Sequence, residues 1–522
     1  MKKITVLFFA VAVLGGLFLI GAISATGAVD IQRGGTLRVT GASLERIDHP
    51  ARYSWIAQSN WTRHIAEYLT FTDENNVTHP WLLERWEASQ DLMTWTLYLR
   101  KGVKWNNGDD FIADDVVFTM KEWLDPEVGS SILGLMAYLK PENIEKLDDY
   151  TVRLQLDSPQ IAVPEHMYHY PAQVMNHRTF EGDFLKAPVG TGPFVLEEFV
   201  PGERVVLRRR TDPPYWRMGT DGKPLPYLDK IIYLDLGTEA SPLIAAILGG
   251  EVDVISEPST EVFMALREDP NLHVIGTPTA STRVLRMRVD REPWDDWQVR
   301  LALKLCQDRE KILKMAHYGE GVVGQDHHVA PIHPAYYQME TPAYDPERAK
   351  ALLAKAGYPD GLSVDLYVAT SVVDAVSYAE ILKEDAAPAG FDINIKTMPI
   401  TAYWDIWTEC DLGITPWAHR PLATIVLGLA YIADEEGKPV PWNETRWVDD
   451  EFSALLKEAE GTLDVEERRE IMGKLQKIQM ERGSIAIAYW MNVWSIANIK
   501  VQNFKGHPTA YDLFTDIWIK QP

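Results

Sequence analysis

The stretch from Trp95 to Leu124, WTLYLRKGVKWNNGDDFIADDVVFTMKEWL, decides the fold. It predicts a strand through Leu99, because apolar residues alternate with polar ones over its first part. A turn follows at 106–109, where Asn-Asn-Gly-Asp favours tight backbone conformations. A helix then begins near Asp114, since carboxylates suit a first helical turn and apolar residues follow at helical spacing. The stretch therefore predicts a strand, a turn and a helix in succession.

The amino-acid sequence of residues 99–123 also closely resembles the signature of the peptide-type, family 5, extracellular solute-binding proteins of ABC importers. That signature is a strand ending in L-R-x-G-V-x-W/F, an x-x-G-x-x-F turn, and a helix that opens with A-D-D-V-V. Further matches are GGTL at 34–37, PVGTGPF at 188–194 and YDPERAKALLAKAGY at 344–358. The resemblance covers essentially the whole mature chain.

The resemblance implies an α/β fold, the two-lobed periplasmic-binding-protein fold of type II. It implies the large variant, which has an extra subdomain in the first lobe. The expected boundaries are lobe 1 at 29–283, including the extra subdomain at about 75–187, lobe 2 at 284–488, and a return of lobe 1 at 489–522.

Two local patterns add expectations of their own. Residues 229–255 predict a strand–helix–strand unit, which is typical of a doubly wound α/β lobe. Residues 60–74 are expected to be helical.

The N-terminus has the pattern of a secretory signal peptide. Lys2 and Lys3 precede an apolar run from Ile4 to Ile23, and small residues at 26–28 predict cleavage after Ala28. The apolar run is also long enough to span a bilayer, so an uncleaved anchor is the alternative. No cysteine lies near the cleavage site for lipid attachment. We therefore expect an exported, periplasmic protein with residues 1–28 removed.

The net charge limits the classes of binding partner, and the cysteine content bears on a possible disulfide. The formal net charge of −24 argues against nucleic acid and against an anionic membrane surface as binding partners.

Cys306 and Cys410 are the only cysteines, and in an exported protein such a pair suggests a disulfide. Two isolated buried thiols are the alternative, and we favour it because the sequence does not place the two residues within bonding reach.

Candidate chemistry is sparse. The pairs Asp109-Asp110 and Asp114-Asp115 could serve as catalytic carboxylates of a secreted glycan-acting hydrolase, but turn and helix-capping roles explain them better. No nucleophile–base signature or metalloprotease motif occurs elsewhere. The histidines at 327, 328 and 333 could bind Ni²⁺ or Zn²⁺, yet they lie in a proline-rich loop where hydrogen bonding or solvation is the more frequent role. We therefore predict no catalytic residue, no bound metal and no cofactor.

Aromatic residues are candidates for lining a ligand pocket. Six of the eighteen tryptophans lie in poorly regular stretches, where flat rings could stack on a ligand or simply pack: Trp55, Trp61, Trp404, Trp407, Trp417 and Trp442. We predict ligand contacts for Trp55, Tyr403, Trp404 and Trp417. We do not expect a phosphate-binding loop at 188–194, because no Lys-Ser/Thr follows it. The resemblance places the same loop, with Thr191, at the edge of the ligand cavity.

The segment from Asp411 to Asp434, DLGITPWAHRPLATIVLGLAYIAD, carries the most information about the ligand. In the peptide-binding members that it resembles, an aspartate stands three residues after the corresponding tryptophan and pairs with the ammonium group of the peptide. Here Arg420 occupies that position, and His419 precedes it. A guanidinium prefers carboxylates or phosphates, so we expect an anionic or hydroxyl-rich ligand at these two residues. Solvent exposure, or pairing with a nearby acid, is the alternative for Arg420.

The resemblance implies the periplasmic substrate-binding component of a peptide/opine/nickel-type ABC importer. Such a protein captures a small polar solute between two lobes, closes by hinge motion and delivers the solute to permease subunits in the inner membrane. We expect a monomer without enzymatic activity. The alternatives are the secreted hydrolase and, if the N-terminal run stays attached, a membrane-anchored interaction domain.

Overall fold

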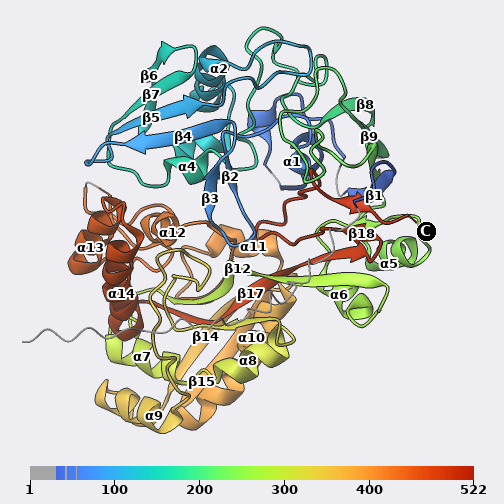
Figure 1. The fold of residues 1–522 in the computed structure, drawn as a ribbon. Coiled ribbons are helices and arrows are strands. Elements are labelled where there is room, and N and C mark those ends of the chain that lie inside the picture. Colours follow the sequence, from blue (N-terminus) through green and yellow to red (C-terminus); the bar gives the residue numbers. More distant parts are fainter. Residues whose placement is uncertain (1–30, 42–43, 55, 435, 522) are drawn as a thin grey trace, which may run out of the picture.

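A computed structural model describes residues 31–521 apart from 42–43, 55 and 435. The predicted signal peptide lies outside the described residues. The chain forms two lobes joined by one continuous mixed sheet (Figure 1). Its strand order is β15-β14-β16-β12-β17-β11-β1-β10-β9-β8, with β13 paired to β17 beside this path. The two-lobed α/β architecture is therefore as predicted.

One half of the large sheet belongs to the first lobe. It contains β1 (Thr36–Gly41), β8 (Phe194–Val200), β9 (Arg204–Arg209), β10 (Lys230–Asp235) and β11 (Val254–Ile255). The strand β1 runs parallel to both β10 and β11, which confirms the doubly wound unit expected at 229–255. The helices of this half are α1 (Ile56–Thr62), α5 (Ala240–Leu248) and α6 (Thr260–Leu266), with the 3₁₀ turn η1 (Pro50–Arg52).

The extra subdomain of the first lobe has its own sheet and its own core. Four antiparallel strands follow the order β4-β5-β7-β6. Their bounds are β4 (Leu83–Ala88), β5 (Thr94–Leu99), β6 (Leu139–Asp148) and β7 (Thr151–Leu156), and the helices are α2 (Ala113–Leu124), α3 (Ser131–Leu135) and α4 (Val163–His166). The strand, turn and helix predicted at 95–124 are thus β5, the turn at 106–109 and α2. A hairpin of β2 (Thr70–Thr72) and β3 (Thr78–Pro80) reaches from this region toward the second lobe (Figure 1).

The second lobe carries the other half of the large sheet. Its strands are β13 (Gly321–Val323), β14 (Leu362–Ala369), β15 (Phe391–Met398) and β16 (Leu412–Trp417). Its helices are α7 (Trp297–Leu305), α8 (Arg309–Ala316), α9 (Pro346–Lys355), α10 (Val373–Ala386), α11 (Ile400–Ile406), α12 (Ala423–Ala430), α13 (Asp450–Glu460) and α14 (Val465–Arg482), with the 3₁₀ turn η2 (Ala387–Ala389).

Two long strands run through both lobes. They are β12 (Leu272–Met287) and β17 (Ile485–Asn498), which pair antiparallel along most of their length. The pairing register shifts between Pro278 and Thr282 and again before Val284. The lobe boundaries predicted at 284 and 489 fall within these two strands. The chain then ends in the first lobe with the short strands β18 (Val501–Gln502) and β19 (Trp518–Ile519).

The predicted helix at 60–74 is wrong. The helix α1 ends at Thr62, and residues 70–72 form β2 instead. The backbone carbonyls of His64 and Ile65 accept hydrogen bonds from Phe194 and Gly192 of the 188–194 loop, at 3.0 Å and 2.8 Å. These carbonyls are therefore bonded to another segment, and the helix does not continue. Within the described part of the chain, no helix is long and apolar enough to span a membrane.

Candidate ligand site

Residues 417–424 lie where the two lobes meet. They follow β16, which runs parallel to β14, and in open α/β sheets ligands bind beyond the carboxyl ends of such strands. Leu422 packs into the hydrophobic core of the first lobe's subdomain. The side-chain amide of Asn76, in the β2–β3 turn, donates a hydrogen bond to the carbonyl of Pro421 at 2.8 Å. The segment is therefore held from both lobes.

His419 uses one ring nitrogen within the protein and keeps the other as a donor. Its Nδ1 accepts a hydrogen bond from the backbone N–H of Ala280 on β12 at 3.0 Å, so the neutral ring carries its proton on Nε2. Burial lowers the pKa of His419 well below its usual value, and the charge of Arg420 lowers it further. Among the described residues Nε2 has no hydrogen-bond partner, so this N–H is an unpaired donor within that part of the chain.

Arg420 supplies a positive charge to the same place. The side chain is half-buried, and its Nη1 donates to the carbonyl of His419 at 3.1 Å. Burial lowers the pKa of the guanidinium, while Tyr170 of the first lobe raises it. Arginine stays protonated in proteins despite such shifts. No carboxylate of the described chain lies within ion-pair distance, so the positive charge of Arg420 has no counter-charge from the protein.

The start of α12 adds further donors to this place. The helix begins directly after Leu422, whose side chain cannot cap it, and the first N–H groups of a helix have no acceptor within the helix. Thr424, in its first turn, is 5% exposed, and its Oγ1 has no hydrogen-bond partner among the described residues. A helix N-terminus favours negative charge through its dipole and free N–H groups. The free N–H of His419, the guanidinium of Arg420 and the first N–H groups of α12 are therefore all donors, and the guanidinium adds a positive charge.

His333 fixes the backbone of the segment. Its Nδ1 accepts from the N–H of Ala330 at 2.9 Å, so Nε2 carries the proton and donates to the carbonyl of Arg420 at 3.0 Å. Burial lowers the pKa of His333 to about 4, which keeps the ring neutral and this tautomer stable. This role was not predicted from the sequence, because the loop and the segment lie 87 residues apart in the chain.

The two neighbouring histidines are also hydrogen-bonded. His328 Nδ1 lies 2.7 Å from the hydroxyl of Tyr431, and His327 Nε2 lies 3.0 Å from the side-chain amide of Gln476. Burial lowers the pKa of His327 to about 3. No three His, Cys, Asp or Glu side chains gather as a metal site in the part of the chain that the structure describes. The structure thus assigns hydrogen-bonding roles to the histidines that were considered as metal ligands.

A buried ion pair contacts the start of the segment 417–424, and the sequence analysis did not predict it. The guanidinium Nε of Arg286 is 3.3 Å from Glu444 Oε2, and both side chains are almost completely buried. Glu444 also accepts hydrogen bonds from Thr415 Oγ1 at 2.6 Å and from Trp417 Nε1 at 2.9 Å. Tyr403 is fully buried, with its hydroxyl 2.8 Å from Thr415 Oγ1. Tyr403 and Trp417, both predicted to contact ligand, are therefore buried in this hydrogen-bonded network.

The remaining predicted site residues are distributed differently. Trp404 is 41% exposed on α11, next to Tyr403. Thr191 is fully buried in the first lobe, where its carbonyl accepts a hydrogen bond from Arg210 at 2.9 Å. Trp55 lies outside the described residues. The structure thus brings Trp417, His419, Arg420, Tyr403 and Trp404 together in the second lobe, whereas this contact of Thr191 stays within the first.

The other candidate chemistry has structural roles. Asp115 is fully buried, and its Oδ2 accepts from the N–H of Ile112 and from Trp105 Nε1, both at 3.0 Å. It therefore caps α2 and anchors the preceding turn. Cys306 and Cys410 are both free and buried, so the disulfide considered from the sequence does not form.

Comparison with known proteins gives consistent matches along the chain. Residues 77–422 match the family described as bacterial extracellular solute-binding proteins, family 5 Middle. The heme-binding protein A of Haemophilus influenzae is 27% identical over 478 residues, which cover 83% of this chain and 83% of that protein. The dipeptide-binding protein of Escherichia coli is 26% identical over 475 residues, covering 84% and 86%.

Solved structures agree on the fold. HbpA2 from Haemophilus parasuis superposes with a TM-score of 0.82 at 23% identity, covering 94% of this chain and all of that one. DppA from Helicobacter pylori, in complex with the peptide STSA, superposes with a TM-score of 0.71 at 23% identity, covering 94% and 99%. The family match spans more than half of the chain. The chain therefore belongs to the bacterial extracellular solute-binding proteins of family 5, the substrate-binding components of ABC importers.

Proposed function

We propose that this protein binds, in the periplasm, a small solute with an anionic group, and that this group is held by His419, Arg420 and the first turn of α12. The protein then delivers the solute to the permease subunits of its importer and catalyses no reaction. The observation that carries the proposal is the guanidinium of Arg420, which lies where the lobes meet and has no counter-charge from the described chain. A carboxylate or phosphate of the ligand supplies that charge.

The relatives named above include proteins described as binding dipeptides and heme, and peptide carboxylates and heme propionates are both anionic. A free-amine peptide held by its ammonium does not suit this site. An ammonium group facing Arg420 would leave both charges unpaired, at a cost of several kcal/mol. A peptide with the reverse orientation, or with a blocked amine, remains compatible with the proposed site.

Identification of the bound solute tests the proposal. We expect mass spectrometry of material released from the purified protein to find a solute with at least one carboxylate or phosphate. Arg420→Ala should weaken the binding of that solute, measured by calorimetry, by about 10- to 100-fold, as for loss of hydrogen bonds to a charged group. Arg420→Lys should retain part of the affinity. Arg469→Ala, at another half-buried arginine of the second lobe, is the control.

Two results would contradict the proposal. One is a tightly bound natural solute without any anionic group. The other is an Arg420→Ala variant that binds the solute as tightly as the wild type does.

Export is a separate part of the proposal. The signal-peptide pattern places cleavage after Ala28, so N-terminal sequencing of periplasmic material should begin at Val29. Intact Met1 in the membrane fraction would instead show that the apolar run remains as an anchor.

A further inference from the structure

Five aromatic side chains form a continuous row in the second lobe, which we call the aromatic row. Its members are Tyr403, Trp404, Trp407, Trp442 and Trp417. The distances between successive ring centroids in this order are 5.7, 5.6, 6.0 and 5.8 Å. The corresponding interplanar angles are 69°, 83°, 87° and 68°, so neighbouring rings stand nearly perpendicular.

The two ends of the row are buried and its middle is open. Tyr403 and Trp417 are 0% and 4% exposed, whereas Trp404 and Trp442 are 41% and 46% exposed. An exposed group of large apolar side chains on an otherwise charged surface commonly marks a binding site. The buried end of the row, Trp417, precedes His419 of the proposed anion site by two residues in the chain. In Figure 1, α11, which carries Trp404, lies on the side of the second lobe that faces the first.

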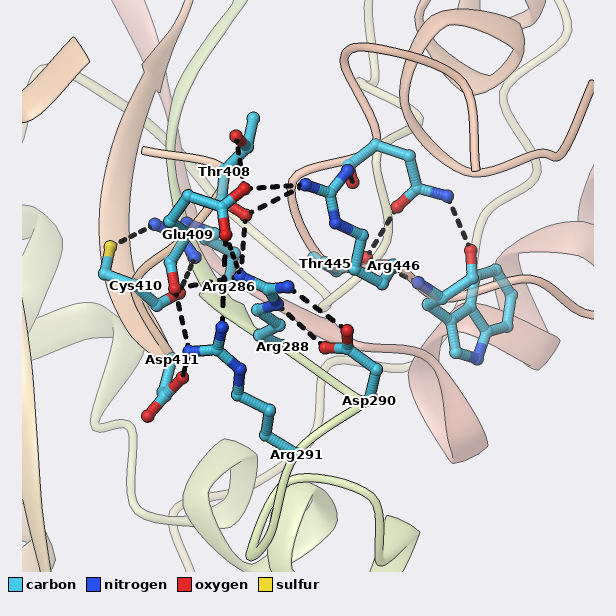
Figure 2. Close-up of polar contacts among 12 residues, drawn as sticks. Arg286, Arg288, Asp290, Arg291, Thr408, Glu409, Cys410, Asp411, Thr445 and Arg446 are labelled. Atoms are coloured by element: carbon cyan, nitrogen blue, oxygen red, sulfur yellow. Dashed lines mark hydrogen bonds and ion pairs between the residues drawn. The ribbon is translucent and has the colours of Figure 1, made fainter. Parts of the chain in front are cut away.

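Arginines hold the backbone of residues 408–410, directly after Trp407 of the row (Figure 2). Arg288 Nη1 donates to the carbonyls of Thr408 at 3.2 Å and Glu409 at 2.9 Å, and Arg446 Nη2 also donates to Thr408. Arg286 Nη1 donates to the carbonyl of Cys410 at 2.6 Å. These carbonyls belong to the loop between α11 and β16, so the arginines fix the position of that loop.

The same network joins all three segments of the row. Arg446 lies four residues after Trp442, and Glu444, between them, binds both Trp417 Nε1 and Arg286. The segments carrying Trp404 and Trp407, Trp417, and Trp442 are therefore fixed relative to one another. Surface tryptophans without a binding role do not require such support, whereas a preorganised binding surface does.

We propose that the aromatic row binds a planar aromatic or conjugated part of the solute whose anionic group occupies the site at His419 and Arg420. Two perpendicular indoles form a corner. A planar aromatic group can stack on one ring and turn its edge to the face of the next, which are the arrangements that aromatic pairs prefer. A saturated ring of the same size gains only the burial of apolar surface. This inference rests on the proposed function, and it defines the solute class as planar aromatic anions.

Two probes with the same anionic group test the inference. They are naphthalene-2-sulfonate and its saturated counterpart decahydronaphthalene-2-sulfonate, titrated calorimetrically into the purified protein after bound solute has been removed. We expect the aromatic probe to bind about tenfold more tightly, from two ring–ring contacts. Trp404→Ala and Trp442→Ala should each reduce this preference. Trp297→Ala is the matched control, because Trp297 is 47% exposed on α7, outside the row, and the preference should be unchanged.

Arg420→Ala separates the two proposals. It should weaken both probes alike and leave the aromatic preference intact. If the tryptophan variants lose the preference for the aromatic probe while Arg420→Ala leaves the affinity for both probes unchanged, the result would support the aromatic row and contradict the anion site. Equal affinities of the two probes in the wild type, or no binding of either, would overturn the inference about the row.

The natural solute provides a second measurement that needs no variant. A planar conjugated solute released from the purified protein should absorb in the near ultraviolet or visible region, and its mass should correspond to an aromatic structure. A wholly aliphatic solute in stoichiometric amount would overturn the inference, even if that solute were anionic as proposed.

Discussion

At the residue scale, Arg286 and Glu444 show how the site is supported from behind. Burial raises the pKa of Glu444, and the neighbouring Arg286 opposes that shift. The carboxylate also holds Thr415 and Trp417, so a single acid links the ion pair to β16. Removing one partner of such a pair costs far more than the pair itself contributes, because the other charge stays buried and unpaired.

We therefore expect Glu444→Ala to lower the free energy of unfolding by about 3–5 kcal/mol, measured by urea denaturation. Glu409→Ala is the control. Its carboxylate pairs with Arg288 and Arg446 but is 57% exposed, so its removal should cost no more than about 1 kcal/mol. Equal losses for the two variants would contradict the supporting role assigned to Glu444.

At the residue scale, the sequence could single out a candidate position where a motif marks it, and it could not reveal contacts between residues far apart in the chain. Arg420 could be singled out because the resemblance assigns a role to the position three residues after the tryptophan. Asn76 and His333 could not, because they reach the same segment from 345 and 87 residues away. Nothing in their local sequence reports such a contact.

At the element scale, local chemistry predicted β5, the following turn and α2, and the structure confirms all three. The signal was strong there because strand alternation, turn residues and capping carboxylates agree. Residues 60–74 were assigned wrongly for the opposite reason. Their helical pattern is overruled by the 188–194 loop, which takes up the carbonyls of His64 and Ile65. Tertiary context of this kind routinely overrides local propensity.

That loop packs so closely that Gly190 has no room for a side chain. A Cβ placed on Gly190 would lie 1.9 Å from the backbone oxygen of Ile65, which cannot move without disturbing the loop contacts. We expect Gly190→Ala to destabilise the protein by at least about 3 kcal/mol in chemical denaturation, the upper range for overpacking.

Gly134→Ala provides the matched control for this prediction. Gly134 lies in α3, where an added Cβ would have no heavy atom within 4 Å, and alanine is the better helix former by up to about 1 kcal/mol. This variant should be as stable as the wild type or slightly more so. A Gly190→Ala variant that behaves in the same way would show that the loop is not tightly packed.

At the scale of the whole molecule, the lobes are joined by β12 and β17, which both continue from one lobe into the other. We propose that the hinge lies at the register shifts of β12, where the strand ladder is interrupted and bending costs fewer hydrogen bonds. Closure around a solute is the motion that such a two-lobed arrangement supports. The sequence predicts lobe boundaries at 284 and 489 but not the register shifts, because a bulge within a long strand leaves little trace in its hydrophobic pattern.

The contact between the β2–β3 turn and the second lobe provides a test of closure. Asn76 is 2% exposed, and its amide donates to Pro421 at 2.8 Å and to Ile332 at 3.4 Å across the interface. A ligand that binds both lobes should reduce the radius of gyration in solution scattering and raise the melting temperature by mass action.

Asn76→Ala removes interlobe hydrogen bonds, so the ligand-free variant should have a larger radius of gyration and bind the natural solute more weakly. Asn75→Ala, at an exposed position of the same turn, should behave like the wild type. Identical scattering curves with and without saturating solute would argue against hinge closure, and an Asn76→Ala variant indistinguishable from Asn75→Ala would show that this contact does not hold the lobes together.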